Sequence, residues 1–273
     1  MPNLTAHQSK EFTKILVLGD SGSGKTGSLA SLVEAGYRLR IIDFDNKLDV
    51  LKQFVMRECP DGAHRVDYIT LRDAYKMSPI GPVLSGPAKA FPTAMKLLDH
   101  WKTDVDLGPP KDWGPECVLV LDSLSRMSDA AYDFSETIMP ATKTGQQDSR
   151  AVFYNAQTAV ETAIATLTSD TFRTNVVVIA HVLYMEMPDG TFKGFPQAVG
   201  QKLSPRIPQY FPTTIMFQSK AGKRTIHTVS NALVDLVNPA PFKVEKTYPI
   251  ETGMAEIFTA LQGEPEAKKG KSK

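Results

Sequence analysis

The sequence GDSGSGKT at residues 19–26 matches the pattern G-x-x-x-x-G-K-[ST] without a mismatch. The apolar run Ile15-Leu16-Val17-Leu18 precedes it, and residues 26–35 are rich in helix formers. The predicted order is therefore strand, glycine-rich loop and helix. Backbone amides of such a loop converge on an anion, and the helix N-terminus adds a favourable dipole. The stretch predicts a loop that holds the phosphates of a nucleotide.

Each part of this loop has an expected task. Lys25 is expected to reach the β- and γ-phosphates, and the Thr26 hydroxyl to bind Mg²⁺. The predicted nucleotide-binding residues are Gly19, Asp20, Ser21, Gly22, Ser23, Gly24, Lys25, Thr26 and Gly27. We expect ATP and Mg²⁺ as cofactors. The sequence shows no guanine-reading N-K-x-D motif, and the choice between adenine and guanine stays open at this point. The alternative is a glycine-rich turn that happens to precede a lysine, and the flanking strand and helix argue against it.

The composition is that of an ordinary globular protein. The chain has 273 residues, of which 42% are hydrophobic and 22% charged. We expect one ATPase domain at residues 12–262, a flexible leader at 1–11 and a disordered lysine-rich tail at 263–273. The net charge is +1, and the tail holds four lysines and two glutamates, so the rest of the chain is close to neutral. This argues against a surface that is strongly basic overall, so any contact with nucleic acid must be a local strip or must come from an assembly of several copies.

Neither a membrane span nor a secretory signal is expected. The apolar stretches are much shorter than the roughly 20 residues that cross a bilayer. The first ten residues, MPNLTAHQSK, lack the apolar segment of a signal peptide. The two cysteines, Cys59 and Cys117, have no metal-ligand spacing and are expected to be free thiols. A cytoplasmic location follows from these features.

Strands alternating with helices predict an α/β fold with a mostly parallel sheet. After the loop we expect strands near residues 38–45, 66–69, 116–122 and 175–181, and helices near 48–56, 88–102, 123–137 and 151–168. The segments 213–218 and 223–229 predict an antiparallel pair, and 252–261 a closing helix. Glycine and proline predict loops at 76–87, 104–115 and 184–206.

A second motif lies in the predicted strand at residues 116–122. Four apolar residues, Val118-Leu119-Val120-Leu121, lead to Asp122, which is the Walker B arrangement. A buried strand of this kind delivers a carboxylate to Mg²⁺. We expect the strand of the phosphate loop and this strand to lie side by side, so that Thr26 and Asp122 form the metal site.

The order of strand ends resembles the RecA-like recombinase core. The strand after the phosphate-loop helix ends in IIDFDNKLD, the Walker B strand in LDSLSRM, and the next strand in VIAHV. More closely, the chain resembles the phage-encoded RecA-like ATPases linked to single-strand annealing, in the GPAKAF stretch at 86–91, the LGP…W loop at 107–113 and His181. The resemblance covers roughly residues 12–262.

The resemblance implies catalytic roles. Asp45 takes the position of the general base, where the recombinase core has glutamate, and Asp122 that of the magnesium ligand. His181 takes the position of the γ-phosphate sensor, and Lys25 completes the set. From the residues alone, Asp45 could instead cap the following helix, Asp43 could be the base, and His181 could be a strand-end histidine bonded to backbone.

The resemblance also implies DNA contacts at two loops, 139–150 and 184–206, where cations and aromatic residues are interleaved. The candidate DNA-binding residues are Lys143, Arg150, Lys193, Lys202 and Arg206. Cations near a hairpin tip are candidates for action on a neighbouring protomer's nucleotide, and these are Lys220, Lys223 and Arg224. Ordinary solvated loops are the alternative for both groups.

The sequence therefore predicts a DNA-stimulated, RecA-like ATPase that binds single-stranded DNA and promotes recombination or annealing. The expected partners are single-stranded DNA, further copies in a ring or filament, and a single-strand-binding protein. One rival is a helicase-type or packaging-type motor on the same core. Another is a nucleotide-switched adaptor with negligible turnover.

Overall fold

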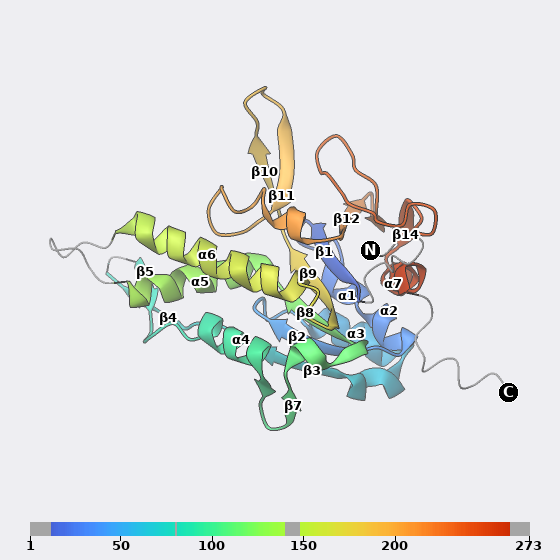
Figure 1. Ribbon diagram of the computed structural model, residues 1–273, viewed down its shortest axis with the longest axis horizontal. Coiled ribbons are helices and arrows are strands. Elements are labelled where there is room, and N and C mark those ends of the chain that lie inside the picture. Colours follow the sequence, from blue (N-terminus) through green and yellow to red (C-terminus); the bar gives the residue numbers. More distant parts are fainter. Residues whose placement is uncertain (1–11, 80, 140–147, 263–273) are drawn as a thin grey trace, which may run out of the picture.

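A computed structural model describes residues 12–79, 81–139 and 148–262. An eight-stranded sheet lies at its centre, in the order β14-β13-β12-β1-β9-β8-β2-β3 (Figure 1). The strands from β12 to β3 are parallel, and β13 and β14 are antiparallel. The mostly parallel α/β architecture with an antiparallel C-terminal extension is therefore confirmed. The expected leader and tail lie outside the described residues.

The strands of the central sheet are β1 (Lys14–Gly19), β2 (Arg38–Asp43), β3 (Val66–Thr70), β8 (Gly114–Asp122), β9 (Thr174–Ala180), β12 (Thr213–Lys220), β13 (Lys223–His227) and β14 (Thr247–Pro249). The α-helices are α1 (Lys25–Ser28), α2 (Ala30–Ala35), α3 (Asp49–Glu58), α4 (Ala90–Asp99), α5 (Leu124–Ile138), α6 (Ser149–Thr168) and α7 (Gly253–Gln262). Short 3₁₀ segments are η2 (Pro60–Arg65), η3 (Pro110–Asp112) and η4 (Ile207–Tyr210).

The central strands are buried on both faces because helices cover each side of the sheet. Along β1, Leu16 and Leu18 face a core that includes residues of α4, α5 and α6. The alternate residues, Ile15 and Val17, face a second core with α2, α3 and α7. This period-2 division explains why these strands read as continuous apolar runs. The sheet is the middle layer of three.

One expectation about strand order is wrong. β9 lies between β1 and β8, so the phosphate-loop strand and the Walker B strand are not neighbours. The reason is a long-range crossover, in which the strand after α6 inserts at the centre of the sheet. Their carboxyl ends nevertheless face the same edge, because all three strands are parallel.

Two segments expected to be loops contain antiparallel hairpins. β4 (Tyr75–Ser78) pairs with β5 (Gly81–Leu84), and β10 (Val182–Glu186) pairs with β11 (Phe192–Pro196). A small pair, β6 (Trp101–Lys102) and β7 (Asp106–Gly108), lies at the third predicted loop. Glycine and proline marked the turns correctly, but apolar and aromatic residues between them sustain short strands. The β10–β11 pair, called the projecting hairpin below, stands out from the body at the top of Figure 1.

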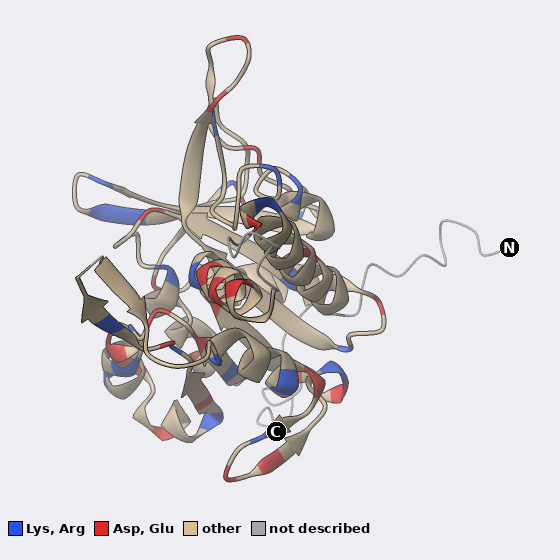
Figure 2. Cartoon of the chain, turned by 90° about the vertical axis from the view of Figure 1, so that its left-hand side faces the viewer, with Lys and Arg blue, Asp and Glu red and all other residues tan. Residues whose placement is uncertain are grey.

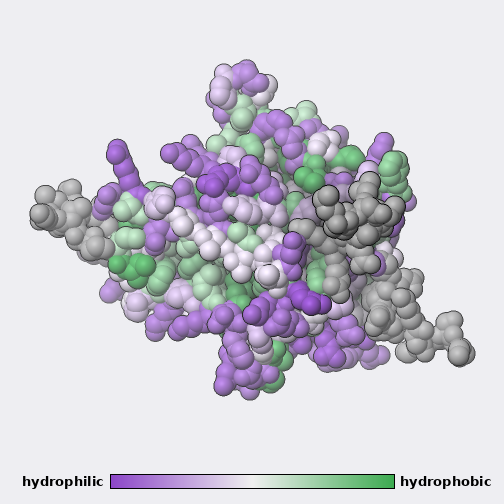
Figure 3. All heavy atoms as spheres, viewed as in Figure 1, coloured by the Kyte–Doolittle hydropathy of each residue, from purple (hydrophilic) through white to green (hydrophobic). Residues whose placement is uncertain are grey.

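Several large apolar side chains are exposed outside the core. Met77 on β4 is 83% exposed and Ile138 at the end of α5 is 51% exposed, and Figure 3 shows apolar colour at that end of the molecule. Phe242, in the segment between β13 and β14, is fully exposed. In the described part of the chain no helix is long and apolar enough to cross a membrane. Cys59 and Cys117 are free thiols, as expected.

Candidate nucleotide site

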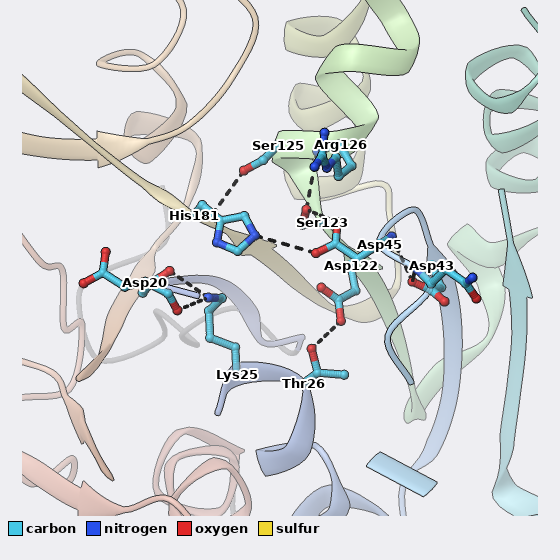
Figure 4. A network of polar contacts seen from close by, with 12 residues as sticks. Asp20, Lys25, Thr26, Asp43, Asp45, Asp122, Ser123, Ser125, Arg126 and His181 are labelled. Atoms are coloured by element: carbon cyan, nitrogen blue, oxygen red, sulfur yellow. Dashed lines mark hydrogen bonds and ion pairs between the residues drawn. The ribbon is translucent and has the colours of Figure 1, made fainter. Parts of the chain in front are cut away.

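The glycine-rich loop joins β1 to α1 and carries the buried side chain of Lys25 (Figure 4). The Lys25 ammonium donates to the carbonyl oxygens of Gly19 at 2.7 Å and Asp20 at 2.8 Å. Gly24 precedes α1 with φ 97°, a left-handed conformation that favours glycine. A Cβ at residue 24 would lie only 2.0 Å from Ile250 Cδ1. Glycine is therefore required there both by the backbone and by the segment packed over the loop.

The surroundings of Lys25 favour an anion. Burial lowers the pKa of Lys25 to about 8, although the negative charges of Asp122, Asp20 and Asp45 oppose this. A bound polyphosphate would add negative charge next to the ammonium and favour its charged form. Because the buried Lys25 ammonium is poorly solvated, an anion such as phosphate would stabilise its charged form.

Thr26 and Asp122 are in direct contact at the end of the sheet. The Thr26 hydroxyl donates to Asp122 Oδ2 at 2.6 Å. Asp122 is 3% exposed, and burial raises its pKa to about 6. Two oxygen groups beside a phosphate loop fit Mg²⁺, which takes one or two protein oxygens and completes its shell with phosphate and water. Among the described residues, no three His, Cys, Asp or Glu side chains form a metal cage by themselves.

Asp43 and Asp45 have different surroundings. Asp43 ends β2 and is 1% exposed; its Oδ1 accepts from the backbone amides of Asp45 at 3.0 Å and Asn46 at 2.7 Å, and its Oδ2 from the Thr70 hydroxyl at 3.1 Å. Burial raises the pKa of Asp43 against these bonds. Its carboxylate therefore shapes the turn after β2. Asp45 does not cap α3, because Leu48 occupies the cap position of that helix.

The Asp45 carboxylate meets two partners from other strand ends. Its Oδ1 accepts from the Ser123 hydroxyl at 2.9 Å, and its Oδ2 lies 3.6 Å from His181 Nε2. Burial would raise the pKa of Asp45, but the contacts with His181 and Ser123 outweigh it and the pKa is lowered. Asp45 therefore stays ionised over the neutral range (Figure 4).

His181 lies between β9 and the projecting hairpin. Its backbone amide donates to the Ser125 hydroxyl at 3.1 Å, and its carbonyl accepts from the Gln197 amide at 2.8 Å. The imidazole is 25% exposed and points towards Asp45. The backbone of His181 is therefore hydrogen-bonded, as expected for a histidine at a strand end. Its ring does not take part in these bonds and faces Asp45.

The candidate DNA-binding residues do not form one basic strip. Lys193 pairs with Asp235 at 2.8 Å and Arg206 pairs with Glu161 at 2.7 Å. Arg150 and Lys202 are exposed, with no ion pair to a described residue. Lys143 lies outside the described residues. Figure 2 shows acidic residues at the tip of the projecting hairpin, so its tip is not a cationic surface.

The candidate trans-acting cations lie on the β12–β13 hairpin. Lys220 and Lys223 are exposed near its turn and pair in register. Arg224 borders the protein's own loop, with its Cδ 3.3 Å from the position of a Cβ at Gly24. Arg224 therefore lies beside the nucleotide loop of the same chain.

The residues Ser123, Ser125 and Ile250 were missed by sequence reasoning. Ser123 directly follows Asp122, which is the one signal that could have drawn attention to it. A cavity of about 610 Å³ adjoins the loop, lined by residues that include Ser28, Phe54, Arg224 and Ile250. No pattern in the sequence brings these four elements together.

The strand order β12-β1-β9-β8-β2, with the phosphate loop on β1 and acidic residues ending β8 and following β2, defines a RecA-like P-loop fold. The sequence model of a family described as "AAA domain" matches residues 11–235. The chain belongs to this AAA domain family. Family membership and the phosphate loop together support a nucleotide hydrolase.

Two solved structures match the chain at low sequence identity. The crystal structure of the RadB recombinase is 15% identical, with a TM-score of 0.43, and the match covers 88% of this chain and 89% of that one. The assembled ATPase EscN, in complex with its central stalk EscO from the type III secretion system of enteropathogenic E. coli, is 13% identical with a TM-score of 0.42. That match covers 76% of this chain and 42% of EscN. No curated protein matches the chain.

Proposed function

We propose that the protein is an ATPase that binds single-stranded DNA and promotes recombination or strand annealing. The observation that carries its ATPase part is the continuous set of contacts at the loop. Lys25 is held by the loop carbonyls, Thr26 contacts Asp122, and Asp45 contacts Ser123 with His181 nearby. These groups are the ones that phosphoryl transfer to water requires: phosphate donors, a metal position and a carboxylate for the water.

Binding begins with the loop amides and Lys25, which hold the β- and γ-phosphates. Thr26 and Asp122 would hold Mg²⁺, which supplies charge neutralisation at the phosphates when bound. Because Asp122 is buried, its carboxylate is solvated poorly and gains strongly from a cation. Lys25 would thus bind the phosphates, and Asp122 at the end of β8 would bind the metal.

Asp45 orients the attacking water. Phosphoryl transfer depends more on positioning and charge stabilisation than on a strong base, so a carboxylate of lowered pKa is sufficient. Its two oxygens are already constrained by Ser123 and His181. His181 stands beside Asp45 and is proposed to respond to the γ-phosphate. After loss of the γ-phosphate, the His181 imidazole would keep only its contact with Asp45.

The cavity next to the loop is proposed to hold the nucleoside. The edge of the Phe54 ring lies close to Gly27, with Cε2 2.9 Å from the position of a Cβ there, and Ile250 covers Gly24. The lining combines the apolar side chains of Phe54 and Ile250 with polar and charged groups such as Arg224, a mixture that suits the faces and the polar edge of a purine. Arg224 borders the same cavity and is proposed to contact the nucleotide, either of its own chain or of a neighbour in an oligomer.

The DNA contact is proposed for the face that includes the projecting hairpin. Phe192 is 52% and Tyr184 is 40% exposed there, which suits stacking of single-strand bases. Arg150 and Lys202 are exposed cations for phosphates. Self-association into a ring or filament, a single-strand-binding protein as partner, a cytoplasmic location and a phage origin belong to the same proposal.

One assay tests the proposal: phosphate release by the purified protein with Mg·ATP, with and without single-stranded DNA, over a series of salt concentrations. We expect turnover that DNA stimulates, with stimulation that declines as salt rises because phosphate contacts release counterions. Tight ATP binding without turnover would favour the adaptor. DNA unwinding or translocation would favour the motor. No binding of Mg·ATP by calorimetry would overturn the proposal.

A further inference from the structure

We propose that Ser123 is a positioning residue for the carboxylate of Asp45, a role that rests on the proposed ATPase function. Ser123 follows Asp122 at the end of β8 and is fully buried, at 0% exposure. Its hydroxyl donates to Asp45 Oδ1 at 2.9 Å. The contact joins the end of β8 to the segment after β2, and Figure 4 shows the two side chains facing each other.

The direction of this hydrogen bond is fixed by the start of α5. Ser123 is the N-cap residue of that helix, and its Oγ accepts from the backbone amide of Arg126 at 3.4 Å. A serine hydroxyl has one proton to donate. Because the helix amide uses the oxygen as an acceptor, the proton is free to point at Asp45, whose carboxylate can only accept. The hydroxyl is therefore oriented before any nucleotide binds.

Asp45 needs this support because it lies outside regular structure, between β2 and α3. Its backbone amide is held by Asp43 Oδ1 at 3.0 Å, but that bond does not fix the side chain. The other carboxylate oxygen has His181 at the longer distance of 3.6 Å. The Ser123 contact is the shorter of the two that restrain the carboxylate.

This arrangement has a kinetic consequence. A reacting group displaced by about 1 Å can lose on the order of 100-fold in rate. Without the Ser123 hydroxyl, the Asp45 carboxylate would rotate about its side-chain bonds and align water poorly. Nucleotide binding would change little, because the hydrogen bonds of Ser123 join Asp45 and Arg126, which lie outside the glycine-rich loop. Ser123 thus acts through Asp45 and not on the nucleotide.

The test is the ATPase activity of Ser123→Ala, measured as kcat and KM with Mg·ATP. We expect kcat to fall by about 10-fold to 100-fold with KM nearly unchanged. Ser123→Cys keeps the shape of the side chain, with a somewhat larger Sγ, but offers only a weak donor, so its kcat should fall as in Ser123→Ala even if the alanine variant folds poorly. The matched control is Ser128→Ala, on the same helix, since Ser128 is 1% exposed and its hydroxyl has no hydrogen-bond partner among the described residues. Its kcat should equal that of the original protein.

A double-mutant cycle separates positioning from helix capping. If Ser123 acts through Asp45, Ser123→Ala causes no further loss of kcat in an Asp45→Asn background. A capping role alone would lower the melting temperature and would add its effect in both backgrounds. Unchanged kcat in both Ser123 variants, or a full additional loss in the double variant, would overturn the inference.

The outcomes also separate this inference from the proposed function. If Asp45→Asn hydrolyses ATP at the original rate, the role of Asp45 fails, and with it the role of Ser123. If Asp45→Asn is slow while both Ser123 variants are normal, only the positioning role fails. Absence of any turnover in the unmodified protein contradicts the ATPase proposal itself.

Discussion

The loop edge of the sheet and the projecting hairpin use their polar residues differently. At the loop edge, Lys25, Asp122 and Asp45 are buried or nearly so, and each contacts a group from another element. On the projecting hairpin, Lys193 pairs at the surface with Asp235 from the segment after β13, and Phe192 is exposed without an aromatic partner among the described residues. Removing one partner of a buried polar group costs about 1–3 kcal/mol of stability, because the other partner is left unsatisfied. An exposed ion pair contributes only about 0–1 kcal/mol. Substitutions at the loop edge should therefore have much larger effects.

The largest effect is expected for Lys25→Ala. Removing the ammonium takes away the main positive charge at the phosphates, so turnover should fall by about 1000-fold or more. Phosphate release and calorimetric titration with Mg·ATP measure it. Lys52→Ala, an exposed lysine on α3, is the control and should retain activity. Substantial turnover by Lys25→Ala would contradict the expectation that substitutions at the loop edge have larger effects than those on the projecting hairpin.

Asp45→Asn should slow hydrolysis by about 100-fold while nucleotide binding is kept. The amide preserves the shape and can still accept a hydrogen bond from Ser123, but it carries no charge to polarise water. Single-turnover hydrolysis and calorimetry separate the two effects. An equal loss of binding would mean that Asp45 contacts the nucleotide or its metal.

Asp122→Asn should stabilise the nucleotide-free protein while impairing turnover. Burial raises the pKa of Asp122 to about 6 from the ordinary 3.8, so the folded state favours the protonated form. The stabilisation from that proton is complete below the ordinary pKa and is lost as pH rises through about 6. At neutral pH the ionised carboxylate is therefore unfavourable, and asparagine should raise the free energy of unfolding by about 1–3 kcal/mol.

Thermal or urea unfolding at neutral and acidic pH checks this sign. The difference in the free energy of unfolding between Asp122→Asn and the unmodified protein should shrink as the pH falls below about 4. There Asp122 is protonated in both the folded and the unfolded protein. Asp129→Asn, an exposed carboxylate on α5, serves as the control and should change stability by less than about 1 kcal/mol. A destabilised Asp122→Asn at neutral pH would contradict the argument from burial.

The smallest effect is expected on the projecting hairpin. Phe192→Ala should weaken single-stranded DNA binding by about 1–3 kcal/mol through the loss of one stacking surface, and leave ATP turnover without DNA unchanged. Fluorescence anisotropy with a labelled oligonucleotide measures the affinity. Phe242→Ala removes a ring that is even more exposed, from the segment between β13 and β14, and should have no effect. Equal losses in both variants would argue against a specific contact on the hairpin.

The loop edge could be read from the sequence because its chemistry requires fixed residue types at fixed spacing. Residues 19–26 and the apolar run before Asp122 correctly predicted the turn between β1 and α1 and the buried strand β8. The position of β9 between β1 and β8 could not be found in this way, because strand order depends on contacts between distant segments. Nor could the contact of Ser123 with Asp45, since a serine after a strand carries no distinctive pattern.

The projecting hairpin was missed for a different reason. Gly190, Gly194 and Pro196 indicate loop structure, yet Tyr184 packs across from Gly194 and supports the pair. The expected cationic strip was also incomplete, because Lys193 and Arg206 have acidic partners on separate segments, Asp235 and Glu161. Partners far apart in sequence cannot be recognised from composition.

Ile250 lies beyond the region matched by the family, which ends at residue 235, yet it covers Gly24. A residue from the C-terminal part of the described chain therefore packs over the glycine-rich loop. A protein shortened to the family region would leave one side of the loop open to water, with β14 and α7 removed as well. The described residues after 235 thus complete both the second core, through Met254, Ile257 and Phe258, and the packing over the glycine-rich loop.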